Sequence, residues 1–141
     1  MTIAASLKDN KVEVLSTIVD EVSLNMLQKS LDRQRNVWIN AYLAQDFNAI
    51  APLLSPDFRC INGKESSDKA EWQALLQKLW QAEDWIENPL VPNRTRYHFF
   101  TPNECMVTLY FKNAQHANVM QELWMKHDDS WKFTALSTIK R

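Results

Sequence analysis

The sequence is poor in several residue types that particular classes of protein need. Its 141 residues include one glycine and two cysteines, and its formal net charge is −1. A single glycine does not make a glycine-rich phosphate loop, and Cys60 and Cys105 are too far apart for a Cys-x-x-Cys or zinc motif. Because the chain has no basic excess and no apolar run long enough to cross a bilayer, we expect no nucleic-acid and no membrane partner.

What remains is the composition of one globular domain with an aromatic-rich interior. Hydrophobic residues make up 45% of the chain, and six tryptophans and six phenylalanines are among them. A chain of this length can bury a core without metal or disulfide support, so we expect both cysteines to be reduced thiols. The opening "MTIAASLKDNK" lacks the basic start and apolar run of a signal peptide, and we expect a cytoplasmic protein.

The first half of the chain has the periodicity of helices. Asp46 is placed to cap a short helix, "FNAIAPLLS", and Asp68 and Glu71 have capping-box spacing at the start of the next one. A long helix is expected before these two, from about Met26 to Asp46, and Arg35 lies within its apolar arc, where it either extends to the helix end or points inward above a pocket. For residues 1–25 a leading helix is favoured over an arm. The apolar arc of the long helix contains Leu27, Leu31, Trp38, Ile39, Tyr42 and Leu43.

The second half changes to the two-residue period of strands. Four segments, "RTRYHFF", "ECMVTLYFK", "HANVMQELWMK" and "WKFTALSTIK", alternate in side-chain character and are separated by turn residues. Helices followed by an antiparallel meander indicate an α+β domain in which the helices cover one face of the sheet.

Two stretches resemble a known superfamily. "NVWINAYLAQDFNAIAPLLSPDFRCING" and "ELWMKHDDSWKFTA" are similar to the opening and the closing hairpin of the NTF2-like (nuclear transport factor 2-like, SnoaL-like) superfamily. The resemblance covers residues 26–141 and leaves 1–25 as an N-terminal extension. It implies a cone in which the N-terminal helices pack on the concave face of a curved, mainly antiparallel sheet. The same fold hosts isomerases, cyclases, dehydratases, epoxide hydrolases and binding modules, so it does not select a chemistry.

The turns decide which side chains face the helices. If every hairpin loop has an even length, Arg96, His98 and Glu122 lie on the more apolar face, which should pack against the helices. Buried ionisable groups have displaced pKa values that acid–base catalysis can use, so His98 and Glu122 are weak catalytic candidates. The alternative is a structural role, in which Glu122 pairs with Arg96 or Arg35.

The opposite, outer face of the predicted sheet also carries apolar residues. Exposed in a monomer, they would form a sizeable patch, and the resemblance implies that two such faces pair. We therefore expect a homodimer. The apolar residues placed on this face are Tyr97, Phe99, Met106, Tyr110 and Leu123.

The resemblance carries over no catalytic residue. Isomerases of the superfamily use an oxyanion donor and a carboxylate base. Tyr42 is a possible donor, but the first strand offers Asn62 where a base is needed. The epoxide hydrolases use an Arg-x-Asp arrangement, and Arg94-Thr95-Arg96 lacks the acid. The predicted pocket residues are Arg35, Trp38, Tyr42, Trp72, Arg96, His98, Cys105, Glu122, Trp124, Trp131 and Phe133.

These observations favour a domain that binds a small, largely apolar ligand in a cone-shaped pocket, without a metal or other cofactor. Two alternatives stay open. One is an isomerase, cyclase or dehydratase that uses His98 and Glu122 as acid–base groups. The other is a protein-interaction or dimerisation module without a ligand.

Overall fold

The computed structural model describes residues 10–14, 21–81, 92–112 and 117–140. The strands are β1 (Asn10–Val14), β2 (Leu54–Asn62), β3 (Glu65–Asp68), β4 (Arg94–Thr101), β5 (Glu104–Lys112), β6 (Ala117–His127) and β7 (Ser130–Lys140). The helices are α1 (Glu21–Leu43), α2 (Phe47–Ile50), the 3₁₀ turn η1 (Ala51–Leu53) and α3 (Lys69–Gln81).

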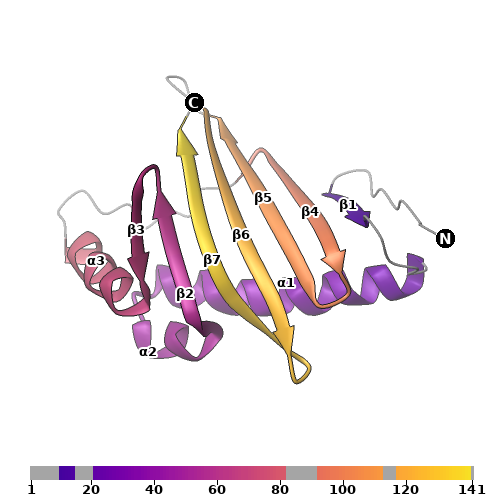
Figure 1. The fold of residues 1–141 in the computed structure, drawn as a ribbon, viewed down its shortest axis with the longest axis horizontal. Coiled ribbons are helices and arrows are strands. Elements are labelled where there is room, and N and C mark those ends of the chain that lie inside the picture. Colours follow the sequence, from indigo (N-terminus) through magenta and orange to yellow (C-terminus); the bar gives the residue numbers. More distant parts are fainter. Residues whose placement is uncertain (1–9, 15–20, 82–91, 113–116, 141) are drawn as a thin grey trace.

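The described strands form one mixed, curved sheet that the helices cover on a single face. The strand order is β1-β4-β5-β6-β7-β2-β3, and α1 runs across the concave side of this sheet (Figure 1). This is the α+β arrangement that the sequence predicts. Within the described part of the chain, no helix is both long and apolar enough to cross a membrane.

Local signals in the sequence explain where the short elements begin. The backbone N–H of Glu71 donates to Asp68 Oδ1 at 2.8 Å, and the N–H of Asp68 donates to Glu71 Oε1 at 3.1 Å, which completes the expected capping box of α3. The N–H of Ala49 donates to Asp46 Oδ1 at 3.2 Å, so the predicted cap of α2 is confirmed as well.

The β6–β7 hairpin turns through two aspartates. Asp128 and Asp129 have φ angles of 49° and 63°, and His127 pairs with Ser130. Two successive left-handed residues are the signature of the tight hairpin turn whose twist matches that of the strands, and aspartate tolerates this conformation better than most residues. The predicted turn at 128–129 is therefore confirmed.

The predicted orientation of β4 is wrong. A bulge between Phe99 and Thr101 shifts the β4–β5 register by one residue, so that Tyr97 pairs with Val107. A shift of one residue moves every side chain of a strand to the opposite face. Tyr97 and Phe99 are therefore buried on the concave side, whereas Arg96 and His98 lie on the outer face.

A second bulge corrects the prediction for the end of β7. Trp124 pairs with Phe133, as expected, but Leu123 pairs with Ala135, which leaves one extra residue on β7. Beyond this bulge Leu136 takes the inner position opposite Glu122 and is buried. Trp131 and Phe133 keep their predicted inner positions, while Ala135 moves to the outer face.

The N-terminal region also differs from the expected leading helix. Residues 10–14 form β1, which pairs in parallel with β4 at one edge of the sheet. Residues 1–9 and 15–20 lie outside the described residues, and α1 already begins at Glu21. At the opposite edge, β3 was not predicted either: it pairs with β2 across a turn in which Gly63 has a φ of 64°. That left-handed conformation suits the only glycine of the chain.

Candidate functional site

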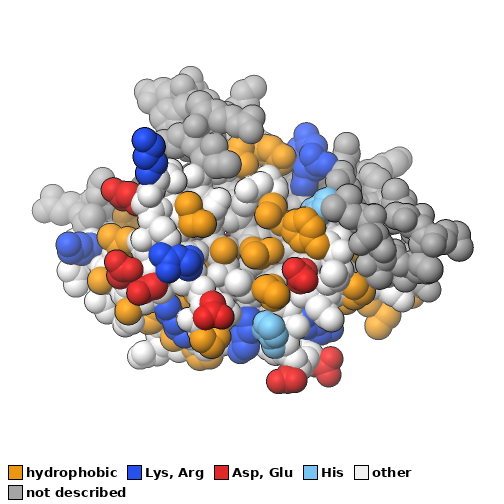
Figure 2. Space-filling view, viewed as in Figure 1, with side chains coloured by type: hydrophobic (Ala, Val, Ile, Leu, Met, Phe, Trp, Pro, Cys, Tyr) orange, Lys and Arg blue, Asp and Glu red, His pale blue; other side chains and the backbone are white. Residues whose placement is uncertain are grey.

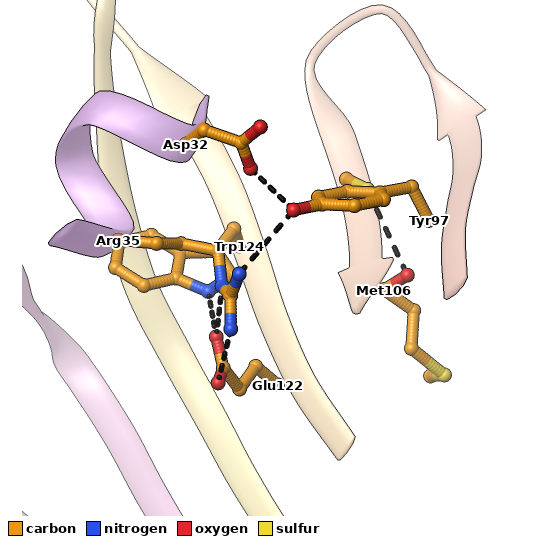
Figure 3. Close-up of polar contacts among 7 residues, drawn as sticks. Asp32, Arg35, Tyr97, Met106, Glu122 and Trp124 are labelled. Carbon is orange, nitrogen blue, oxygen red and sulfur yellow. Dashed lines mark hydrogen bonds and ion pairs between the residues drawn. The ribbon is translucent and has the colours of Figure 1, made fainter. Parts of the chain in front are cut away.

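A buried ion pair joins α1 to the middle of the sheet. The Nε atom of Arg35 donates to Glu122 Oε1 at 2.8 Å, and Nη2 donates to Oε2 at 3.1 Å (Figure 3). The exposed fractions of these two residues are 8% and 2%. A planar guanidinium that binds both oxygens of a carboxylate is an arrangement that a lysine could not reproduce. Of the two alternatives for Arg35, the structure therefore shows the inward one.

Three further side chains extend this pair into a network. Trp124 Nε1 donates to Glu122 Oε1 at 2.8 Å, and Arg35 Nη1 donates to the Tyr97 hydroxyl at 3.3 Å. The Tyr97 hydroxyl in turn donates to a carboxylate oxygen of Asp32, one helical turn before Arg35 (Figure 3). We call these five residues the α1 polar cluster. It connects α1 with β4 and β6 on the concave side.

The electrostatics of the α1 polar cluster favour fixed protonation states. Burial raises the pKa of Tyr97 well above its ordinary value, more than its contact with Arg35 lowers it, so the phenol is protonated at neutral pH and can donate to Asp32. Burial alone lowers the pKa of Arg35, but the charge and hydrogen bonds of Glu122 more than offset this and raise it. Because both oxygens of Glu122 accept hydrogen bonds, the geometry suits an orienting role better than proton transfer.

Aromatic rings cover the concave side beyond the α1 polar cluster, toward the C-terminal end of α1. The centroid of Trp38 lies 5.2 Å from that of Tyr42 and 5.7 Å from that of Trp72, and the centroids of Tyr42 and Trp80 are 6.0 Å apart. We call these four residues, from α1 and α3, the aromatic end. Burial raises the pKa of Tyr42. The indole Nε1 of Trp80 is buried and has no hydrogen-bond acceptor among the described residues.

The structure brings most of the predicted pocket residues to the concave side, though not all of them. Arg96 and His98 lie on the outer face, for the reason given above. Cys105 is fully buried, and burial raises the pKa of its thiol, which makes it an unreactive core residue. The residues found on the concave side are Arg35, Trp38, Tyr42, Trp72, Cys105, Glu122, Trp124, Trp131 and Phe133.

Sequence reasoning missed Asp32 and Tyr97. The spacing of Asp32 and Arg35, three residues apart on the inward arc of a helix, was a signal that could have found the first. No comparable signal existed for Tyr97, because its orientation depends on the bulge at the end of β4.

Comparison with known proteins supports the fold but does not name an activity. No protein-family model matches the chain, and no curated protein does. Solved structures do match. An NTF2-like protein from Cytophaga hutchinsonii is 15% identical with a TM-score of 0.65, over 81% of this chain and 98% of its own.

Two other structural neighbours have more specific descriptions. The S. rosetta CaMKII hub is 12% identical with a TM-score of 0.63, over 80% of this chain and 95% of its own. A ketosteroid isomerase-like protein from Shewanella frigidimarina is 10% identical with a TM-score of 0.61, over 80% of this chain and 97% of its own. At these identities the likeness concerns the fold alone: the chain has an NTF2-like fold.

Proposed function

We propose that this chain is an NTF2-like binding domain that takes a small, largely apolar ligand at the aromatic end. The observation that carries the proposal is the indole N–H of Trp80, which is buried and has no acceptor in the part of the chain that the structure describes. A buried donor left unpaired costs about 1–3 kcal/mol, and a ligand that brings an acceptor to this point would remove that cost. The ring of Tyr42 packs against Trp80, and Trp38 and Trp72 continue the row of rings, which gives the apolar surroundings typical of small-molecule sites.

The acid–base alternative has less support. His98 lies on the outer face of the sheet, so it cannot share a concave site with Glu122. Glu122 itself is engaged by Arg35 and Trp124. A role of Glu122 in catalysis stays a prediction, and so does the cytoplasmic location.

We also propose that two copies of the chain pair through the outer sheet face. Hydrophobic side chains gather over the central strands on that face (Figure 2). The β4–β5 and β5–β6 registers place Met106, Tyr110, Leu123 and Met125 there, and all four are only half-buried in one chain. A second copy offers the same apolar surface, and the S. rosetta neighbour, a hub, has the same fold.

Two probes of the same shape test the ligand proposal. Acetophenone has a carbonyl acceptor and ethylbenzene does not, so ligand-observed NMR should detect tighter binding of acetophenone to the wild-type protein. W80F keeps an aromatic ring but loses the N–H. We expect it to weaken acetophenone binding about 2- to 12-fold, the worth of one hydrogen bond, and to leave ethylbenzene binding unchanged. Y110F, on the outer face, is the matched control and should behave as wild type. Equal acetophenone binding by W80F and wild type, or no saturable binding, would overturn the proposal.

A further inference from the structure

The α1 polar cluster holds more negative than positive charge. Its two carboxylates, Asp32 and Glu122, face one guanidinium, that of Arg35. Glu122 takes this guanidinium on both of its oxygens, whereas Asp32 accepts a hydrogen bond only from the neutral hydroxyl of Tyr97 among the described residues. Charges in partly buried positions are normally compensated by a partner. Asp32 feels the charge of Arg35 but has no direct hydrogen bond to it among the described residues, so its charge is the less fully compensated of the two.

A buried acceptor that has no donor among the described residues lies one helical turn earlier. Gln28 precedes Asp32 by four residues, so the two side chains share one face of α1. The Gln28 side chain is 8% exposed, and its Oε1 has no hydrogen-bond donor among the described residues. Its neighbours on the helix, Leu24 and Leu31, are buried apolar residues. An acceptor left unpaired in such surroundings is costly, and a ligand that donates a hydrogen bond would satisfy it.

We propose that Gln28, Asp32 and Tyr97 form a subsite for a protonated amine carried on a small apolar body. An ammonium group has three donors and no acceptor, so it matches a carboxylate, an amide oxygen and the face of a phenol ring. Its charge also compensates that of Asp32. A neutral hydroxyl would satisfy the hydrogen bonds but not the charge, and a carboxylate would be repelled.

This subsite is separate from the aromatic end. Gln28 and Tyr42 are fourteen positions apart on α1, which corresponds to about 21 Å along the helix. The inference therefore goes beyond the proposed function. The amine subsite can be absent while the ligand proposal for Trp80 holds, and the ligand proposal can fail while the amine subsite exists.

A series of three phenyl compounds tests the charge requirement. Phenethylamine is protonated at neutral pH, 2-phenylethanol is its neutral analogue and 3-phenylpropionate is an anion of similar shape. Isothermal titration of the full chain at pH 7 should show phenethylamine binding at least tenfold more tightly than the other two. Equal affinity for all three compounds, or no saturable binding of phenethylamine, would overturn the inference.

Three substitutions locate the subsite. D32N removes the charge but can still accept from Tyr97, and it should weaken phenethylamine binding tenfold or more. Q28L, of similar size, should weaken it several-fold. Q77L, at an exposed position of α3, is the control and should bind as wild type does. If D32N and Q28L also bind as wild type does, the inference is wrong.

If either variant fails to fold, NMR of the wild-type protein still tests whether phenethylamine binds at this subsite. Phenethylamine should then shift the amide resonances of residues 28–32 and leave those of 77–81 unchanged. Shifts confined to other parts of the chain would contradict the inference.

Discussion

Arg35 and Glu122 are separated by 87 positions in the sequence, yet the guanidinium of one binds both carboxylate oxygens of the other inside the domain. The pair connects the middle of α1 to β6, and Trp131 adds a parallel connection from β7. Its Nε1 donates to Ser30 Oγ at 3.0 Å, and its carbonyl accepts from Gln34 Nε2 at 3.1 Å. Polar contacts along α1 thus fix how the helix lies across the sheet, which apolar contacts alone specify less sharply.

Removing one member of the Arg35–Glu122 pair should destabilise the domain strongly. R35M leaves the Glu122 carboxylate buried without a guanidinium, and E122Q leaves Arg35 without its direct ion-pair partner; we expect each to lower the free energy of unfolding by about 3–5 kcal/mol. R35M/E122L replaces both charges by apolar groups and should cost much less than the two single changes together. Urea denaturation measures all three, with R33M at an exposed position of the same helix as the control. Additive single and double effects would show that the two residues do not act as a pair.

Tyr97 should make the domain sensitive to alkaline pH. Because the pKa of Tyr97 is raised in the folded protein, both states hold the proton below pH ~10, the ordinary tyrosine value, and this contribution to stability is then complete. Above that pH the unfolded chain loses the proton first, so stability falls until the folded pKa is reached. Melting temperatures measured from pH 8 to 11 should therefore fall more steeply for wild type than for Y97F. Y110F is the control, and a Y97F slope equal to that of wild type would contradict the assignment.

Leu123 should control the association of two copies. L123E places a charge in the centre of the outer face, where it would be buried on dimerisation, and we expect a monomer in light scattering at micromolar concentration. L75E, at a position 52% exposed on α3, should leave the dimer intact. A wild-type protein that is already monomeric at this concentration would remove the dimer proposal.

The indole N–H of Trp80 should contribute to ligand binding but not to the stability of the ligand-free fold. Since this buried N–H has no acceptor among residues 10–14, 21–81, 92–112 and 117–140, W80F removes an unpaired donor and keeps most of the ring contacts with Tyr42. We expect the melting temperature of the ligand-free protein to be unchanged or slightly higher. W124F is the comparison, because the N–H of Trp124 is bound to Glu122 and its loss should lower the melting temperature. A large loss of stability in W80F would point to a structural bond for its N–H.

The features that could be predicted from the sequence are those that depend on residues close together in the chain. Asp68 and Glu71 mark the start of α3 because a capping box needs only two residues at a fixed spacing, and Asp128–Asp129 mark a turn for the same reason. The apolar arc of α1 likewise indicates which side faces the sheet. The α+β class follows from the order of these elements along the chain.

The features that could not be predicted depend on single-residue shifts. The bulge after Phe99 has no strong local signature in the sequence. It nevertheless places Tyr97 on the concave side, where His98 was predicted, and so alters the candidate site. The pairing of Arg35 with Glu122 was open beforehand, because a long side chain on an apolar arc can also extend to solvent. Choosing between these outcomes required the register of the folded sheet.

The most direct test of the central claim, that the concave side binds a small ligand at the aromatic end, is native mass spectrometry of protein purified gently from cells. We predict one small organic adduct per chain for wild type, with much lower occupancy in W80F, and recovery of a one-to-one adduct when acetophenone is added to stripped wild type. A bare wild-type mass that acetophenone at millimolar concentration does not change would contradict the claim.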